Sequence, residues 1–598
     1  MPPDRERPAM SLVKSNSPEF LTVAQMAARV ADGACISIGG HHFARLPIAL
    51  VRAICKRRPK DLRYLSWAGG LPLEMLLEAE AVASADICFS SLDIFGLAPR
   101  FRKAAETGAI EVNDWPALAL IQSLRAREQN LPFLPMQVPA GSSMMELCPA
   151  LAAHTDPRTG RTVALVEARQ IDVFCVHAPR ADTAGNVEIY GAQALDKIQA
   201  GAAKQVFVTV EEVVPAGHLN ADGRNLIIQR NRVSAIAHVP GGAYPCSCLP
   251  YYATDFARIR EILETEGVRL VDALAVPEDG VPPLMRHAAK VPARAIVPAA
   301  FQPGAVAPDA PPTVDEVMAV RIARSLDNES HASAGAVSPL ANVAYRLAKA
   351  THAPGMMITT LSGGHIDVAA GTMSLSMMET MDAQTAVSHV GGEDSYWFAY
   401  QGGYITHEIV GTAQIDAQGR TNTIGLTKPS GGMLRLPGQG GMADVANMHQ
   451  NFIVYVPRHA PAAMVETVEV VSAGRGLISA AEREAAGYRP GAIMVFTNMC
   501  VFRYDEAVGQ LVVAELMPGA TREDVQANTG FKVIFAEDVA DVAPPTAKEL
   551  FALRHEVDPI GLRRLEFVSA RERGAILDDI IARDRAATER ITGLARPG

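Results

Sequence analysis

A proline- and alanine-rich stretch at residues 291–312 divides the 598-residue chain into two halves of similar size that open in the same way. The first half opens on Thr22-Val-Ala-Gln25, a capping-box pattern that predicts a helix start, and a short apolar strand follows. The second half opens on Thr313-Val-Asp-Glu316, again a capping box, followed by a helix and a strand of small residues. The stretch between them has no usable periodicity and is typical of a linker. The sequence therefore predicts duplicated or paired domains.

Short apolar runs alternate with longer amphipathic stretches in both halves. The expected strands are 171–176, 205–210, 356–360, 452–456, 492–497 and 532–536. The expected helices are 47–53, 116–127, 253–264, 342–349 and 546–554. Strands that alternate with helices favour α/β layers with largely parallel sheets. We expect a disordered tail at 1–20, one α/β domain at 21–290, a linker at 291–312 and a second α/β domain at 313–598.

The composition excludes several classes of function. A formal net charge of −10 argues against a nucleic-acid or anionic-membrane footprint, which needs clustered Lys and Arg. The chain has no run of 18 apolar residues, and its first 20 residues lack the apolar stretch of a signal peptide. Eight scattered cysteines, of which only Cys246 and Cys248 are close in sequence, indicate buried reduced thiols and no metal site. We therefore expect a cytoplasmic protein.

Common catalytic motifs are absent, but glycine turns follow several strands. The sequence contains no P-loop, no H-E-x-x-H and no G-x-S-x-G. Glycine lets backbone N–H groups approach a ligand closely, which suits a developing oxyanion or an anionic cofactor. Tight turns without a ligand are the alternative. These turns are Gly39-Gly40, Gly141-Ser142-Ser143, Gly363-Gly364 and Gly438-Gln-Gly440-Gly441.

The turn at Gly39-Gly40 carries a family resemblance. Asp32-Gly-Ala-Cys-Ile-Ser-Ile-Gly-Gly40 with Arg45-Leu-Pro47 resembles the opening signature of the family I CoA-transferases, although His41 stands where that family usually has Phe. Further stretches of the first half resemble the A subunit of glutaconate CoA-transferase: 100–103, 131–135, 141–142, 177–186 and 242–245. Stretches of the second half resemble its B subunit: 411–419, 438–443, 470–474 and 523–531.

This resemblance implies a fold and an activity. We expect two CoA-transferase-type α/β domains, A-subunit-like at 21–290 and B-subunit-like at 313–598, packed pseudo-symmetrically around an active site. The family uses a glutamate at the end of a second-half strand to attack the acyl-CoA thioester. Here Leu361 occupies the place of that glutamate, and no acidic residue lies between Met357 and Ile366. Leucine has no lone pair and cannot act as the covalent nucleophile.

The missing glutamate favours a hydrolytic enzyme. Water would attack a carbonyl of a β-keto or cyclic acyl-CoA, with opening of a C–C ring as one possibility, and the site would need a general base and an oxyanion donor. His365 is a candidate base because imidazole titrates near neutrality, and a structural histidine is the alternative. Gly440 or Gly441 could supply the oxyanion N–H.

Two alternatives stay open. A true CoA-transferase could move CoA between carboxylic acids with a displaced carboxylate, Glu379 or Glu393, although either could be a surface carboxylate. A non-catalytic acyl-CoA-binding protein would keep the ligand site without turnover.

The resemblance also implies where ligands bind. We expect the substrate to be bound by seven residues of the first half: Gly39, Gly40, His41, Arg45, Gly141, Ser142 and Ser143. His41 and His42 are adjacent, so on an extended segment at most one of them faces the site. We expect CoA, which is part of the substrate, to bind near Gly438, Gly440, Gly441 and Met442. We expect no tightly bound cofactor and no metal. The expected partner is an acyl-CoA, and we expect no binding to nucleic acid or to a membrane. The sequence decides neither whether the chain forms a homo-oligomer nor which acyl group it binds.

Overall fold

The computed structural model describes residues 17–219, 225–302, 306–307, 309–335, 338–360, 363–475 and 478–594. Leu361 and the first 16 residues of the expected tail lie outside the described residues. Both predicted capping boxes are confirmed, at Thr22 with Gln25 and at Thr313 with Glu316. No helix in the described part of the chain combines the length and the apolar character needed to cross a bilayer.

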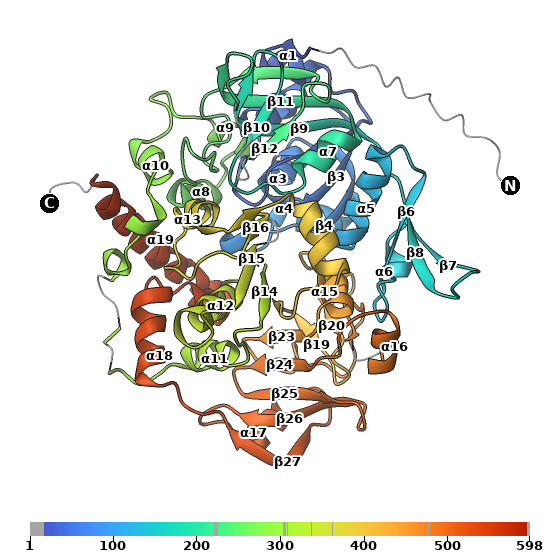
Figure 1. The fold of residues 1–598 in the computed structure, drawn as a ribbon, viewed down its shortest axis with the longest axis vertical. Coiled ribbons are helices and arrows are strands. Elements are labelled where there is room, and N and C mark those ends of the chain that lie inside the picture. Colours follow the sequence, from blue (N-terminus) through green and yellow to red (C-terminus); the bar gives the residue numbers. More distant parts are fainter. Residues whose placement is uncertain are drawn as a thin grey trace.

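The first half is built on one large sheet whose main path is parallel throughout (Figure 1). Its strands in spatial order are β1 (Glu19–Phe20), β13 (Ala235–His238), β11 (Ala203–Val214), β9 (Ile171–Asp182), β2 (Cys35–Ile38), β3 (Leu62–Ala68), β4 (Val82–Phe89) and β5 (Glu111–Asp114). Two short antiparallel strands, β10 (Val187–Ile189) and β12 (Leu226–Ile228), extend it. A separate antiparallel sheet holds β6 (Phe133–Met136), β8 (Thr162–Glu167) and β7 (Leu151–Thr155).

Helices connect and cover these strands, as the alternation of the sequence predicts. They are α1 (Val23–Ala28), α2 (Ile48–Arg57), α3 (Gly70–Glu78), α4 (Pro99–Thr107), α5 (Ala117–Glu128), α6 (Met144–Leu147), α7 (Asp196–Ala202), α8 (Phe256–Glu264), α9 (Leu270–Ala273) and α10 (Pro283–Ala288). Glu19 and Phe20, expected in the tail, pair with Ala235 and Ile236 at the edge of the large sheet.

The second half contains two mixed sheets. One comprises β14 (His331–Ala334), β15 (Met357–Thr360), β16 (His365–Ile366) and β17 (Ser388–His389). The other comprises β18 (Ile409–Gly411), β23 (Phe452–Val456), β24 (Ile493–Thr497), β25 (Cys500–Asp505), β26 (Gln510–Leu516) and β27 (Ile534–Asp541). Strand β25 is antiparallel to both of its neighbours, β24 and β26, so parallel pairing is less complete here than in the first half. Two hairpins join β19 (Gln414–Ile415) to β20 (Thr421–Asn422) and β21 (Gly425–Thr427) to β22 (Met433–Arg435).

The helices of the second half pack around these sheets. They are α11 (Val314–Ala323), α12 (Pro339–Thr351), α13 (Met378–Thr385), α14 (Gly392–Asp394), α15 (Met442–Met448), α16 (Ala480–Ala485), α17 (Arg522–Ala527), α18 (Ala547–Phe551) and α19 (Ala570–Thr592). The helix expected at 546–554 changes to a wider π-helical segment at Ala552–Val557, and the strand expected at 532–536 is displaced to β27.

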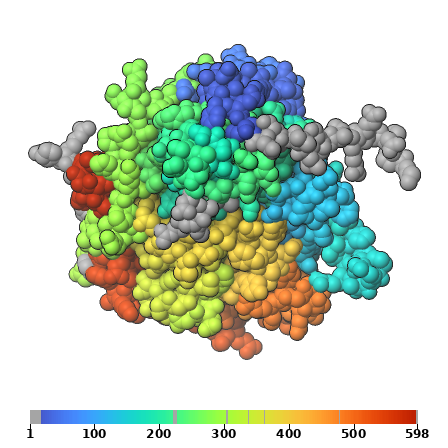
Figure 2. Space-filling view, turned by 45° about the horizontal axis from the view of Figure 1, so that its top comes forward, coloured from blue at the N-terminus to red at the C-terminus, as the bar shows by residue number. Residues whose placement is uncertain are grey.

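The two halves share contacts well beyond the expected linker. Figure 2 shows the first half gathered above the second. One cluster of buried apolar side chains joins Trp67 and Trp115 of the first half to Tyr396 and Met442 of the second. The C-terminal helix α19 reaches back to α8, where Arg260 Nε lies 2.9 Å from Asp578 Oδ1. The halves therefore form one interlocked molecule with the candidate site between them.

Candidate functional site

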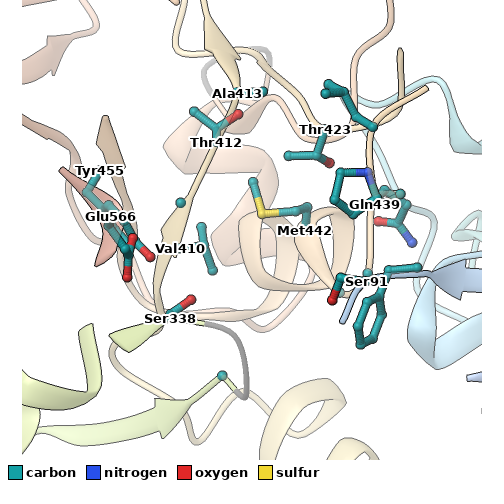
Figure 3. Close-up of a pocket in the computed structure, with 18 of the residues that line it drawn as sticks. Ser91, Ser338, Val410, Thr412, Ala413, Thr423, Gln439, Met442, Tyr455 and Glu566 are labelled. Atoms are coloured by element: carbon teal, nitrogen blue, oxygen red, sulfur yellow. The ribbon is translucent and has the colours of Figure 1, made fainter. Parts of the chain in front are cut away.

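The main cavity, of about 620 Å³, lies where the two halves meet (Figure 3). The first half contributes the aromatic side chains of Trp67 and Phe89, together with His41 and His42. The second half contributes the loop from Gly438 to Met442, and Figure 3 shows Gln439 on one side, Tyr455 with Glu566 on the other, and Met442 between them. A cavity of this size and mixed lining is typical of a small-molecule site.

A second cavity of about 260 Å³ adjoins the first. His41, His42, Ala334 and Gly335 line both cavities and mark their junction. Thr360 and Gly363, which flank the two undescribed positions 361 and 362, line the second cavity. Its other walls are largely apolar and include Phe43, Ile94, Phe256, Met373, Met378 and Leu562.

His41 and His42 both line the cavities, so the expectation that at most one histidine faces the site is wrong. The expectation assumed an extended segment, in which successive side chains alternate. His42 instead has φ 53°, a left-handed conformation, and it breaks that alternation. The two rings lie 3.7 Å apart between centroids. Burial lowers the pKa of His41 well below its usual value, so this ring is neutral at pH 7.

The loop from Gly438 to Gly441 sits against the first-half sheet. The Gly438 amide donates to Thr423 O (3.0 Å) and the Gly440 amide donates to Cys88 O (2.9 Å). Gly438 has φ +126°, and a Cβ there would come within 2.5 Å of Cys88 O, so only glycine fits. Because the Gly440 amide is already occupied, Gly441 is the better placed of the two expected oxyanion donors; its amide has no hydrogen-bond acceptor within the described residues.

His365, the expected base, lies in β16 and lines the second cavity. Its Nδ1 lies 3.1 Å from Nδ1 of His389, and no carboxylate of the described residues orients its ring. Burial, with a smaller contribution from His389, lowers the pKa of His365 to about 3. The ring is therefore a neutral imidazole at pH 7 and a weak base.

Glu379 and Glu393, the two expected carboxylates, lie in different surroundings. Glu379 in α13 lines the second cavity, where its Oε2 accepts from Ser247 Oγ at 2.5 Å and its Oε1 accepts from the Ala192 amide at 3.3 Å. Burial raises the pKa of Glu379. Glu393 is fully buried away from both cavities, its two oxygens have no partner within the described residues, and burial raises its pKa to about 7.

Arg45 supports the glycine turn and lines neither cavity. Its buried guanidinium pairs with Asp196, with Nη1 2.6 Å from Oδ2, and Asp196 Oδ1 accepts from the Gly40 amide at 2.8 Å. Because the whole pair is buried, the Arg45 side chain has no route to a ligand, and a Cβ on Gly39 would come within 2.7 Å of Asp196 Oδ1. Gly40 itself lines only a small adjoining pocket of about 20 Å³.

The turn Gly141-Ser142-Ser143 lies away from both cavities. Ser142 Oγ donates to Pro139 O (2.6 Å), and Ser143 exchanges hydrogen bonds with the backbone of Val471 (2.8 and 3.2 Å). These contacts join the first half to the second. The geometry thus gives this turn a role in holding the halves together, whereas the sequence had predicted it to be among the residues that bind the substrate.

Two acidic groups of the main cavity escaped the sequence reasoning. Glu408 accepts from Tyr400 Oη, which lies 3.0 Å from Ser333 Oγ, and burial raises the pKa of Glu408 to about 7. Glu566 accepts from the Leu340 amide at 2.9 Å, and burial raises its pKa to about 7 as well. Glu566 and Leu340 are 226 residues apart, and no spacing rule links Glu408 to Tyr400 eight residues earlier, so the one available signal was a His-Glu pair at 407–408 ahead of an apolar strand.

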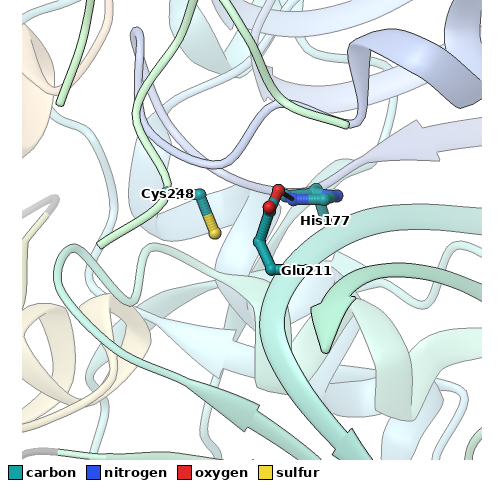
Figure 4. Close-up of side chains that lie close together, drawn as sticks. All are labelled: His177, Glu211 and Cys248. Atoms are coloured by element: carbon teal, nitrogen blue, oxygen red, sulfur yellow. Dashed lines mark hydrogen bonds and ion pairs between the residues drawn. The ribbon is translucent and has the colours of Figure 1, made fainter. Parts of the chain in front are cut away.

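His177, Glu211 and Cys248 form a buried cluster whose spacing would suit a metal ion (Figure 4). The His177 ring nitrogens already have partners, Thr209 Oγ1 at 2.8 Å and Glu211 Oε1 at 2.7 Å. Glu211 also accepts from the Gly241 amide and from Tyr252 Oη. A metal would have to displace these bonds, so the residues fit a closed hydrogen-bonded network better than a metal site.

Large parts of the chain are similar to known proteins. A family model described as coenzyme A transferase matches residues 20–226. The A chain of 3-oxoadipate CoA-transferase from Pseudomonas knackmussii is 32% identical over 40% of this chain and 84% of that protein, and the B chain of the same enzyme is 29% identical over 40% of this chain and 92% of that protein. The cholesterol ring-cleaving hydrolase IpdA subunit of Mycobacterium tuberculosis is 32% identical over 38% of this chain and 81% of that protein.

A solved structure matches almost the whole fold. The acyl-CoA transferase YdiF of E. coli O157:H7, in a thioester complex with CoA, aligns with a TM-score of 0.63 and 14% identity over 90% of this chain and 96% of that one. At 14% identity this match shows similarity of fold alone. The predicted α/β fold class is confirmed by this match and by the large parallel sheet of the first half.

Proposed function

This chain belongs to the coenzyme A transferase family, as its opening signature predicts, and from that premise we propose that it hydrolyses an acyl-CoA. The observation that carries the proposal is Leu361, which stands where the family's attacking glutamate is expected, between two residues that line the second cavity. A leucine at that place leaves water as the nucleophile. The similarity to a protein named as a ring-cleaving hydrolase supports this proposal.

The two joined cavities suggest how the substrate is held. CoA would occupy the main cavity along Gly438, Gly440, Gly441 and Met442, and the acyl group would occupy the largely apolar second cavity. The thioester would then lie near the junction at His41 and His42. The apolar walls suit a β-keto or cyclic acyl group. No tightly bound cofactor or metal is needed for attack by water on a carbonyl.

We extend the proposal to the organisation of the chain. Residues 21–290 would take the place of an A-type polypeptide of the family and residues 313–598 that of a B-type polypeptide, joined through 291–312. Fusion would fix their ratio and keep one half at high effective concentration for the other.

CoA release without an acceptor acid tests this function. We expect free CoA thiol to appear when acetoacetyl-CoA or larger β-keto thioesters are incubated with the protein alone, because water is the acceptor. From a cyclic keto thioester we expect either free CoA thiol or a ring-opened acid that still carries CoA, again without an added acid. Release that needs an added carboxylic acid would contradict hydrolysis. Tight CoA-ester binding with no turnover of any thioester would indicate a binding protein instead.

Transfer through Glu379 is the second candidate, because this carboxylate lines the same cavity as Thr360 and Gly363. Its two oxygens already accept hydrogen bonds from Ser247 and Ala192, which makes this carboxylate a poorer nucleophile than a free one. The variant Glu379→Gln separates the candidates: hydrolysis would persist in part, whereas transfer would be abolished.

A further inference from the structure

His42 and Asp93 form a hydrogen-bonded pair at the wall that the two cavities share. His42 Nδ1 lies 2.5 Å from Asp93 Oδ1, and the two side chains are only 16% and 12% exposed. His42 lines both cavities and Asp93 lines the second one. The pair therefore lies where the proposed function places the thioester.

The pairing determines which ring nitrogen of His42 carries the proton. An ionised carboxylate can only accept a hydrogen bond, so in the neutral imidazole Nδ1 is the donor and Nε2 is the nitrogen with the lone pair. His42 Nε2 is shielded from solvent and has no hydrogen-bonding partner within the described residues. Buried polar atoms without a partner are uncommon in folded proteins, and they point to a group that a ligand or its water satisfies.

The backbone at both residues adds an independent observation. His42 has φ 53° and Asp93 has φ 52°, so both members of the pair adopt the left-handed conformation that side chains other than glycine rarely take. Such conformations cost free energy and tend to occur where function requires them. Hydrogen bonds between His41 and Ala44 (3.0 and 2.8 Å) hold the histidine loop in place.

The other titratable groups of the second cavity are less suited to accept a proton. His365 faces another imidazole, and Glu379 already accepts two hydrogen bonds. Asp382 is paired with Arg346, with an oxygen-to-nitrogen distance of 2.8 Å. His42 is thus the imidazole of this cavity that a carboxylate orients, which is the arrangement of a base and its orienting group in nucleophilic and general-base sites.

We propose that His42, oriented by Asp93, is the general base that activates water for the hydrolysis proposed above, on which this inference rests. His42 Nε2 takes a proton from water, and the water oxygen bonds to the carbonyl carbon. The bond from that carbon to the CoA sulfur then breaks, its electron pair stays on sulfur, and the sulfur takes the proton from the imidazolium. Where a ring ketone is attacked, the bond to the α carbon breaks instead and that carbon takes the proton.

The variant His42→Ala tests the base directly. With acetoacetyl-CoA and the β-keto and cyclic thioester series as probes, we expect kcat to fall by about 10²–10⁴-fold, the usual contribution of a general base. CoA affinity by calorimetry and the thermal unfolding midpoint should stay close to those of the parent. Added imidazole should restore part of the lost turnover, because it can occupy the vacated space. His154→Ala, on the exposed strand β7, is the matched control.

Asp93→Asn tests the positioning residue. The amide can donate to Nδ1 and so favour the other tautomer, and we expect kcat to fall while KM is unchanged, with no rescue by imidazole. Asp93→Glu should recover part of kcat because it restores a carboxylate acceptor.

Three results would overturn the inference. Full turnover in His42→Ala would show that His42 is not the general base, and it would leave the proposed hydrolysis unaffected. Loss of turnover together with CoA affinity and folding, without imidazole rescue, would assign the pair a structural role. Absence of turnover by the parent on every thioester would remove the proposed function itself, and the inference with it.

Discussion

At the scale of single residues, one position decides between the reactions open to this family. Leu361 stands where a glutamate would attack the thioester, and the neighbouring Thr360 and Gly363 line the second cavity. A side chain without a lone pair cannot form the covalent intermediate, however well the cavity binds the substrate.

Leu361→Glu should restore that intermediate. We expect a glutamyl thioester that is sensitive to borohydride and hydroxylamine and that depends on the acyl-CoA, with the adduct located by mass spectrometry. Leu361→Gln is the control, since it has similar size and no nucleophile. An adduct absent from the glutamate variant would mean that position 361 does not face the thioester.

Contacts between residues close in sequence were predictable, whereas contacts between residues far apart were not. The capping boxes at Thr22 and Thr313 were predictable because both partners lie within four residues. The pair of His42 with Asp93 was not, because its members are 51 residues apart, one in a turn and the other at the start of a short 3-10 helix. Arg45 matched the family pattern, yet only the fold reveals its buried partner Asp196, 151 residues away.

At the scale of elements, strands with strong apolar runs were predicted best. β23 at Phe452–Val456 has the expected bounds, because five buried apolar residues between polar ends leave little choice. The strand predicted at 532–536 matches β27 less well. Buried and exposed residues alternate only weakly along β27, and its pairing with β26 shifts register. Pairing partners, which a single strand does not encode, decide such boundaries.

The loop from Gly438 to Gly441 makes a prediction at this scale. Gly438→Ala should lower the free energy of unfolding by about 1–3 kcal/mol and weaken CoA binding, because the left-handed φ is strained and the new Cβ would meet Cys88 O. Gly431→Ala is the matched control, with φ +84° and open space around the Cβ. Urea unfolding and calorimetric titration with CoA measure the two effects. Equal effects in both variants would rule out the clash.

At the scale of the whole molecule, the two halves depend on each other. The α/β class was predictable from the alternation of strand and helix patterns. The shared apolar cluster, the return of α19 to the first half and the contact of Ser143 with Val471 were not. Such contacts join residues hundreds of positions apart, and they create the cavity in which the chemistry is proposed. The site is therefore a property of the assembled chain.

The fate of a labelled water oxygen tests the central claim most directly. The intact protein is incubated in ¹⁸O-water with the thioester that it turns over fastest and without an acceptor acid, and the product acid is analysed by mass spectrometry after a single turnover. We predict one ¹⁸O atom in the product and no acyl-CoA-dependent label on the protein. Unlabelled product together with a borohydride-trapped adduct on Glu379 would contradict hydrolysis and show that this chain is a transferase.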